Sequence, residues 1–123
     1  MKRAGTLTKA EEEVMQVLWG IGKGFVNDIL DRFPEPKPAY NTVSTIVRIL
    51  EQKGFLGFEA FGKSHRYYPL VTKEDYSKSN LNLMVQNYFG GSFKQLVSFF
   101  VKEENLSLKE IEELKSIIDQ NKQ

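Results

Sequence analysis

One stretch of the sequence, from Lys37 to Gly54, has the pattern of a single helix with two different faces. Its apolar residues recur at the spacing by which a helix packs against a core, and they are Val43, Ile46, Val47 and Leu50. The opposite face is polar and lacks carboxylates, and it carries Asn41, Thr45, Arg48 and Gln52. Such side chains can hydrogen-bond to base edges and phosphates in a DNA major groove. An ordinary amphipathic helix with a solvated face has the same pattern, so the stretch alone leaves both interpretations open.

The sequence after this stretch changes from a helical to a strand-like period. The change produces two short aromatic segments, FLGFEAF and HRYYPLV, on either side of a turn that contains Lys63. These segments predict a β-hairpin with a basic turn, and His65 and Arg66 lie next to that turn. Five basic and two acidic residues lie between Lys37 and Arg66, although the whole chain has a net charge of only +1. An ordinary solvated helix does not predict a basic hairpin beside it, so the hairpin favours DNA binding.

Two further helices are predicted before the stretch, one beginning at Thr8 and the other spanning about Val26 to Arg32. Thr8 and Glu11 have the spacing of a capping box, and glycines and prolines end the two helices. The acidic run 11–13 lies at a helix start, where the dipole favours carboxylates, and we interpret it as solvated. Three helices followed by a hairpin predict a winged helix-turn-helix, in which the third helix enters the major groove and the wing touches the flanking backbone.

The candidate DNA contacts are polar, basic or aromatic side chains of the third helix, its start and the wing. They are Lys37, Tyr40, Asn41, Thr42, Ser44, Thr45, Arg48, Gln52, Lys63, His65 and Arg66. A winged helix that serves as a protein-interaction module without DNA binding is the alternative, and it would not need this polar helix face.

The remaining residues offer little chemistry for catalysis or metal binding. The sequence has no cysteine, so it can form neither thiolate metal sites nor a cysteine nucleophile. It has a single histidine, and one histidine without cysteines or clustered carboxylates makes a poor metal site. It also lacks a nucleophile elbow, a phosphate-binding glycine loop and a His-rich metal motif. We therefore expect no enzyme activity, no cofactor and no metal.

The second part of the chain, residues 73–123, is predicted to be all-helical, after a winged-helix domain at 1–72. Capping residues at Thr72, Ser92 and Ser107 mark the starts of three helices. About 50 residues cannot bury this much apolar surface alone, and a second copy of the chain is the simplest cover. Packing against the first helix is the alternative. The expected dimerisation residues are Tyr76, Leu81, Met84, Val85, Tyr88, Leu96, Val97, Phe100, Ile111, Leu114 and Ile118.

The sequence therefore predicts a mainly α chain with a small β-hairpin wing, made of an N-terminal winged helix-turn-helix and a C-terminal three-helix dimerisation domain. Hydrophobic residues make up 41% of the chain, which is typical of a globular protein. No apolar run is long enough to cross a membrane and no signal-peptide pattern is present, so we expect a cytoplasmic protein.

Six blocks carry a resemblance to a known family, and in chain order they read LTKAEEEVMQVLW, VNDIL, NTVSTIVRILEQKGFL, YYPLV, GGSFKQLV and NLSLKEIEELKSII. With these blocks the chain resembles the penicillinase-repressor (BlaI/MecI) family of bacterial transcriptional regulators. The resemblance implies a homodimer with two N-terminal winged-helix domains and a C-terminal helical dimerisation domain. It also implies a repressor that binds palindromic double-stranded operator DNA. In antibiotic-sensing relatives, a signal from a membrane receptor-protease leads to cleavage within the penultimate helix.

The sequence departs from the family pattern at three places. Those relatives are cut at an Asn-Phe bond, and the aligned pair here is Phe99 and Phe100, the candidate cleavage position. A copper-responsive branch carries paired cysteines in its tail, which this sequence lacks, so copper sensing is not expected. Phe25 stands where relatives often have a threonine before the second helix, which removes a cap or phosphate contact. A membrane receptor-protease is thus a predicted partner, acting at a different bond or through another trigger.

Overall fold

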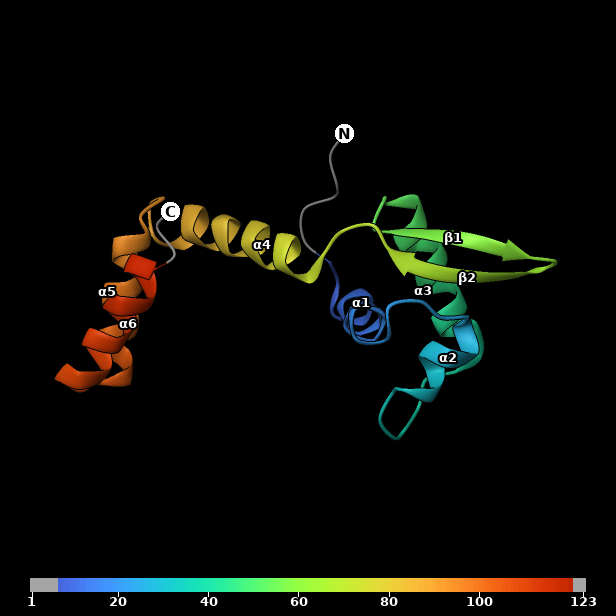
Figure 1. Cartoon of the computed structure of the whole chain (residues 1–123), viewed down its shortest axis with the longest axis horizontal. Coiled ribbons are helices and arrows are strands. Elements are labelled where there is room, and N and C mark those ends of the chain that lie inside the picture. The colour runs from blue at the N-terminus through green and yellow to red at the C-terminus, as the bar shows by residue number, and fades with distance from the viewer. Residues whose placement is uncertain (1–6, 121–123) are drawn as a thin grey trace. The chain divides into compact units, whose positions relative to one another are not determined.

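The computed structural model describes residues 7–120, and it describes side chains as far as Ile117. Contacts within the chain divide it into two units, the first ending at Asn80 and the second beginning at Leu81. The elements, drawn in Figure 1, are α1 (Lys9–Ile21), α2 (Val26–Asp31), α3 (Tyr40–Gln52), β1 (Leu56–Phe61), β2 (Ser64–Pro69), α4 (Lys73–Tyr88), α5 (Phe93–Glu104) and α6 (Leu108–Gln120). The division therefore falls inside α4, whereas the sequence places it before that helix. Among these described helices, none is both long and apolar enough to span a membrane.

The first unit is a mainly helical domain with a two-stranded antiparallel hairpin, as the sequence predicts. In its centre, α3 packs against α1, α2 and β1. The α3 side chains of Val43, Val47 and Leu50 are completely buried, which is the outcome that the spacing of apolar residues predicts. At its C-terminal end, Gly54 has a φ of +87°, a left-handed conformation that glycine adopts without steric cost.

The start of α3 differs from the prediction, because the helix begins at Tyr40 and not near Lys37. Pro36 and Pro38 precede it, and a proline disfavours the helical conformation of the residue before it. Lys37, which precedes Pro38, accordingly lies outside the helix, and Ala39, the residue directly before the helix, is extended, with φ −70° and ψ 152°. The prolines therefore separate α2 from α3 with a non-helical connection.

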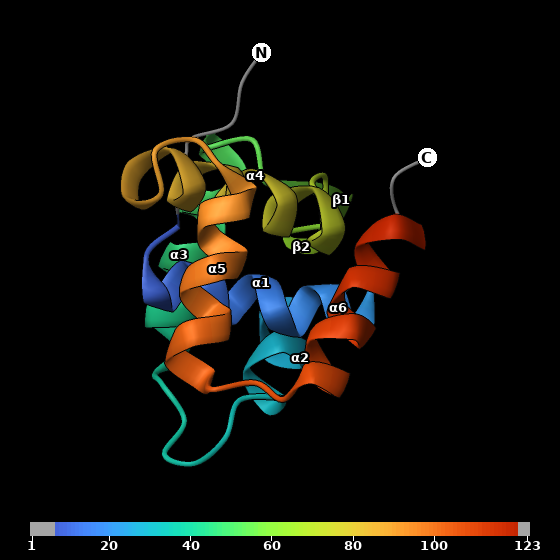
Figure 2. The same ribbon diagram turned by 90° about the vertical axis from the view of Figure 1, so that its left-hand side faces the viewer.

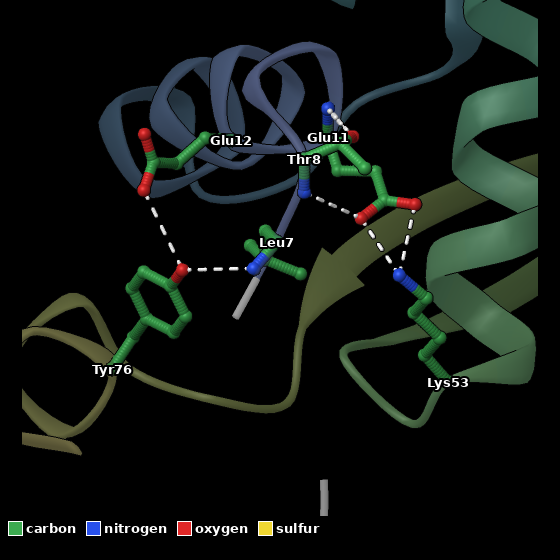
Figure 3. Close-up of polar contacts among 6 residues, drawn as sticks. All are labelled: Leu7, Thr8, Glu11, Glu12, Lys53 and Tyr76. Atoms are coloured by element: carbon green, nitrogen blue, oxygen red, sulfur yellow. Dashed lines mark hydrogen bonds and ion pairs between the residues drawn. The ribbon is translucent and has the colours of Figure 1, made fainter. Parts of the chain in front are cut away.

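The start of α1 confirms one prediction and corrects another. Thr8 and Glu11 form the capping box, in which the Thr8 hydroxyl accepts from the Glu11 N–H at 3.1 Å and the Glu11 carboxylate accepts from the Thr8 N–H at 3.0 Å. Glu11 is only 6% exposed, so the interpretation of 11–13 as a solvated run is wrong at this residue. Lys53 Nζ compensates this buried carboxylate by donating to both of its oxygens, at 2.8 and 3.0 Å (Figure 3). This pair ties the start of α1 to the residue that follows α3.

The loop between α1 and α2 is held along the hairpin by backbone pairing. The Gly24 N–H donates to the Tyr67 carbonyl at 3.0 Å, and the Tyr67 N–H donates to the Gly24 carbonyl at 2.8 Å. A Cβ on Gly24 would lie 2.8 Å from Ile21 Cδ1, so a larger residue here would force the Ile21 side chain to shift. The pairing also fixes the position of Lys23, the residue before Gly24, beside β2.

The first two turns of α4 belong to the first unit, because Tyr76 is part of its core. Tyr76 is 6% exposed, and its ring centroid lies 5.9 Å from that of Trp19 and 6.0 Å from that of Phe55. Its hydroxyl accepts from the Leu7 N–H at 3.1 Å and donates to Glu12 Oε2 at 3.4 Å (Figure 3). Tyr76 is thus covered within its own chain, so its expected role in dimerisation is corrected to a role in the core of the first unit.

The second unit contains the remainder of α4 together with α5 and α6. Ser107 and Glu110 form the predicted capping box, with hydrogen bonds of 2.9 and 3.2 Å, and the Ser92 hydroxyl accepts from the Gln95 N–H at 3.2 Å. Figure 2 shows that the chain descends along α5, turns at the connection and rises again along α6, and Asn105 in this connection has a left-handed φ of 53°. No α5 side chain is fully buried within the chain, although apolar residues on most of its sides predict burial.

The expected dimerisation residues of this unit differ in their exposure. Val85 is 3% exposed and is already covered within the chain. The others are partly buried or exposed, and Ile118 has a side chain outside the described residues. The exposed ones are Leu81, Met84, Tyr88 and Phe100, and the partly buried ones are Leu96, Val97, Ile111 and Leu114. One copy of the chain therefore leaves a large apolar surface uncovered.

Candidate nucleic-acid interface

A groove of about 680 Å³ lies between α3, the start of α2 and the hairpin, all within the first unit. We call it the α3–wing groove. It brings together five of the predicted DNA contacts, which are Tyr40, Ser44 and Arg48 from α3 and Lys63 and His65 from the hairpin. The groove thus combines hydroxyl groups with basic side chains, a set that suits a phosphate backbone and base edges.

One carboxylate, that of Asp28, also lines this groove. Its Oδ2 accepts from the Phe25 N–H at 2.9 Å, which is one half of a capping box, whereas the other half is missing because the Phe25 side chain has no oxygen to accept from the Asp28 N–H. The Phe25 ring instead packs edge-on against Phe61 of the wing, with centroids 5.7 Å apart. The sequence departure at Phe25 therefore joins α2 to the wing.

The exposed face of α3 carries the remaining predicted contacts of this helix. Arg48 is exposed, and its Nη2 donates to Ser44 Oγ at 3.4 Å, which aligns the two side chains along one face. The polar residues that do not line the groove are also exposed, and they are Asn41, Thr42, Thr45 and Gln52. The side of α3 opposite the core is therefore open to a partner.

His65 is stacked on the wing and is half-buried. Its ring lies parallel to that of Phe58, with centroids 4.1 Å apart and an interplanar angle of 9°. The centroid of the Tyr67 ring lies 6.2 Å from that of His65. Burial raises the pKa of the Tyr67 hydroxyl, and the negative charge of Glu51 raises it further. These aromatic contacts hold His65 at the edge of the groove.

Lys37 has a structural partner that the sequence does not reveal. Its Nζ donates to the carbonyl oxygens of Leu30, Asp31 and Phe33, at 3.4, 3.0 and 2.7 Å. A lysine that satisfies the last carbonyls of a helix stabilises the end of that helix. Lys37 therefore caps α2, and it does not line the α3–wing groove.

Arg66 is paired with an acidic residue on the neighbouring strand. Its Nε and Nη2 donate to Glu59 Oε1 at 3.0 and 2.7 Å, and Lys23 Nζ lies 3.2 Å from Glu59 Oε2. The hydrogen bonds from Arg66 and then from Lys23 hold the pKa of Glu59 below its ordinary value. The equal distances of Glu59 and Arg66 from the turn could have revealed their pairing in the sequence, but no local signal points to Lys23.

Comparisons with known proteins agree with this architecture. The sequence profile of the family described as "Penicillinase repressor" matches residues 7–120. The methicillin resistance regulatory protein MecI of Staphylococcus aureus (strain N315) is 32% identical, over 92% of this chain and 93% of MecI. The penicillinase repressor of Bacillus licheniformis is 26% identical, over 99% and 96%. The solution structure of the DNA-binding domain of the repressor BlaI is similar, with a TM-score of 0.53, 27% identity and coverage of 62% of this chain and 94% of that domain.

Proposed function

This chain belongs to the penicillinase-repressor (BlaI/MecI) family of DNA-binding transcriptional repressors, and we propose that it acts in the cytoplasm as a homodimer on a palindromic operator. The observation that carries the proposal is the α3–wing groove, in which Arg48 and Ser44 of α3 lie with Lys63 and His65 of the hairpin. A recognition helix beside a basic wing is the arrangement with which winged-helix domains read the major groove and hold the flanking backbone. The family is one of repressors and not of enzymes.

The homodimer is supported by the apolar surface of the second unit. Tyr88 is 77% exposed, Phe99 is 53% exposed and Leu108 is 74% exposed within one chain. Exposed apolar side chains of this number mark an interaction surface, and a two-fold symmetric dimer uses the same surface of both copies. Such a dimer presents two α3 helices to half-sites about one helical turn, or a multiple of it, apart.

The inducing signal is proposed to act on α5, with a membrane receptor-protease as the partner that sends it. Phe99 and Phe100 are 53% and 47% exposed in one chain, and a cut between them would detach α6. Helix α6 carries Ile111 and Leu114, which are partly buried within the chain. Loss of α6 would therefore weaken the dimer, and the affinity for the operator would fall because the two DNA-binding domains would no longer be linked.

A salt titration of duplex binding tests the proposed function. Phosphate contacts release counterions, so the affinity for a duplex is expected to fall linearly on a log–log plot against salt concentration. The alternative is a winged helix used as a protein-interaction module, and it predicts no salt-dependent binding to any duplex. The duplex for this test can be selected from a random library by the purified full chain.

Substitution of Arg48 tests the role of α3. We expect Arg48→Ala to weaken binding to the selected duplex by about 1–3 kcal/mol and to relax base preference at one position in each half-site. The reason is that an exposed arginine on the polar face of α3 can donate two hydrogen bonds to a guanine. Binding measured on duplexes mutated at each position checks this, and an unchanged affinity for the selected duplex would contradict it.

Lys63→Ala at the turn is the matched substitution for the wing. Lys63 is exposed at the groove, so its ammonium group is placed to contact a phosphate. We expect the variant to bind all duplexes more weakly by the same factor and to lower the salt slope by about 0.9, the value of one contact. A loss confined to one sequence would show that Lys63 reads bases instead.

A further inference from the structure

Three charged side chains gather on one face of the hairpin, and we call them the Glu59 cluster: Lys23, Glu59 and Arg66. The strand register places Glu59 directly opposite Arg66, which donates to it at 2.7 and 3.0 Å. Lys23 reaches the other carboxylate oxygen at 3.2 Å, because the backbone pairing of Gly24 with Tyr67 holds the preceding loop beside β2. One carboxylate thus binds two cations.

The cluster adjoins the α3–wing groove through Phe61. The guanidinium carbon of Arg66 lies 5.0 Å from the centre of the Phe61 ring, and Phe61 lines the groove. The side chains of Lys23, Glu59 and Arg66 are 49%, 38% and 36% exposed, so a phosphate could approach all three. The wing carries the cations Arg66 and Lys63, and the neighbouring loop carries Lys23. Glu59 is paired with two of these three, Arg66 and Lys23.

A carboxylate in this position opposes the binding of a DNA backbone in two ways. It occupies two of the five N–H donors of Arg66 and one of the three of Lys23, and a phosphate would otherwise accept from them. It also adds a negative charge that repels the phosphate over the distance at which exposed charges act, about 10 Å at 0.1 M salt. Contacts to phosphates carry no base information, so the effect is on affinity for every duplex alike.

We propose that Lys23 and Arg66 form a second phosphate-binding point on the wing, and that Glu59 attenuates it. This inference rests on the proposed function, since it concerns how strongly the same domain holds the DNA backbone. Glu59 then lowers the sequence-independent part of the affinity, to which Lys63 also contributes, whereas α3 provides the sequence-dependent part. The groups that would bind phosphate are the guanidinium of Arg66 and the ammonium of Lys23, next to Lys63.

The test substitutes Glu59→Gln in the full chain, which keeps the shape of the side chain and removes its charge. We expect tighter binding to the selected duplex and to a random-sequence duplex by the same factor. We also expect a salt slope that is steeper by about 0.9 for one new phosphate contact and about 1.8 for two. Between 50 and 200 mM salt, this steepening adds a roughly 3.5-fold or 12-fold fall in affinity.

A matched control separates the local effect from the change in net charge. Glu13→Gln removes the same charge from an exposed position on α1, and we expect it to leave the salt slope unchanged. In the Glu59→Gln background, Arg66→Gln or Lys23→Gln should each reverse part of the steepening. In the presence of Glu59, Arg66→Gln and Lys23→Gln should each change the salt slope less than they do in the Glu59→Gln background.

The outcomes distinguish this inference from the proposed function. Duplex binding by the wild type that depends on salt, with an identical slope for Glu59→Gln, would overturn the inference and leave the proposed function standing. Absence of salt-dependent duplex binding by the wild type would overturn both. The charge-swapped pair, Glu59→Arg with Arg66→Glu, keeps an ion pair across the strands but removes the carboxylate that Lys23 binds, so its salt slope is expected to be steeper than that of the wild type by about 0.9 for the one released cation. It therefore tests the inference even if Glu59→Gln lowers the stability of the hairpin, and an unchanged slope for the swapped pair would contradict it.

Discussion

A chain that ends at Asn80 is expected to stay folded, to be monomeric and to bind a palindromic duplex about 10²- to 10⁴-fold more weakly than the full chain. The first unit has its own core, and Tyr76 of α4 belongs to that core. Removal of residues 81–123 takes away the exposed apolar surface of the second unit. This surface is the proposed link between the two DNA-binding domains of the dimer. Each DNA-binding domain then binds its half-site alone, without the high effective concentration that tethering to a second, bound domain gives.

Sedimentation and fluorescence anisotropy measure the two parts of this prediction. A chain that ends at Thr72 is the matched comparison, because it lacks Tyr76 and so uncovers Trp19 and Phe55. We expect its free energy of unfolding to be lower than that of the Asn80 chain by about 3–5 kcal/mol, as for the loss of a large buried aromatic side chain. A stable dimer of the Asn80 chain would show that the dimer interface lies in the first unit.

The second large effect is expected from Lys53→Met, which leaves the buried carboxylate of Glu11 without its cation. Loss of one partner of a buried ion pair costs about 3–5 kcal/mol, and we expect the lower end because the Lys53 side chain is 29% exposed. The methionine keeps most of the apolar stem of the lysine, so the loss is chiefly electrostatic. Urea denaturation at pH 7 measures it, and Lys78→Met, at an exposed position on α4, is the control.

The pH dependence of this effect has a definite sign. Burial raises the pKa of Glu11, but the hydrogen bonds from Lys53 and the Thr8 N–H outweigh it, so the pKa lies below the ordinary value of 4.5. The stability that the ion pair contributes is therefore fully present above about pH 4.5, and it is lost as the pH falls through the lower pKa of the folded state. The difference between wild type and Lys53→Met should shrink when urea denaturation is repeated near pH 3. A difference that stays constant over this range would show that the pair is not its source.

Local sequence signals predicted the elements of this chain well. The apolar spacing of α3 predicted that Val43, Val47 and Leu50 are buried, and they are completely buried. The capping residues Thr8 and Ser107 lie at the starts of α1 and α6. These signals succeed because helix periodicity and capping depend on residues three or four positions apart, which the sequence shows directly. The start of α3 differs from the prediction because Pro38 excludes the residue before it from the helix, which the spacing of apolar residues does not show.

The candidate site was predicted in its residue types but not in the partners of those residues. Five predicted contacts line the α3–wing groove, whereas Lys37 caps α2 and Arg66 is paired with Glu59. The pairing of Lys23 with Glu59 spans 36 residues, and that of Lys53 with Glu11 spans 42. No periodicity or motif reports contacts at such separations, so these cations could not be assigned from the sequence.

The sequence by itself determined that three helices and a basic hairpin form, and which face of α3 is polar. The formation of these elements and the polarity of the α3 face both depend on residues that are near one another along the chain. Only the tertiary structure decided that Glu11 is buried, that Tyr76 belongs to the first unit and that Glu59 holds two cations of the wing. Each of these depends on a side chain whose partner is distant in the sequence, and the free energy of burying or pairing a charge is set by that partner and by the water it excludes.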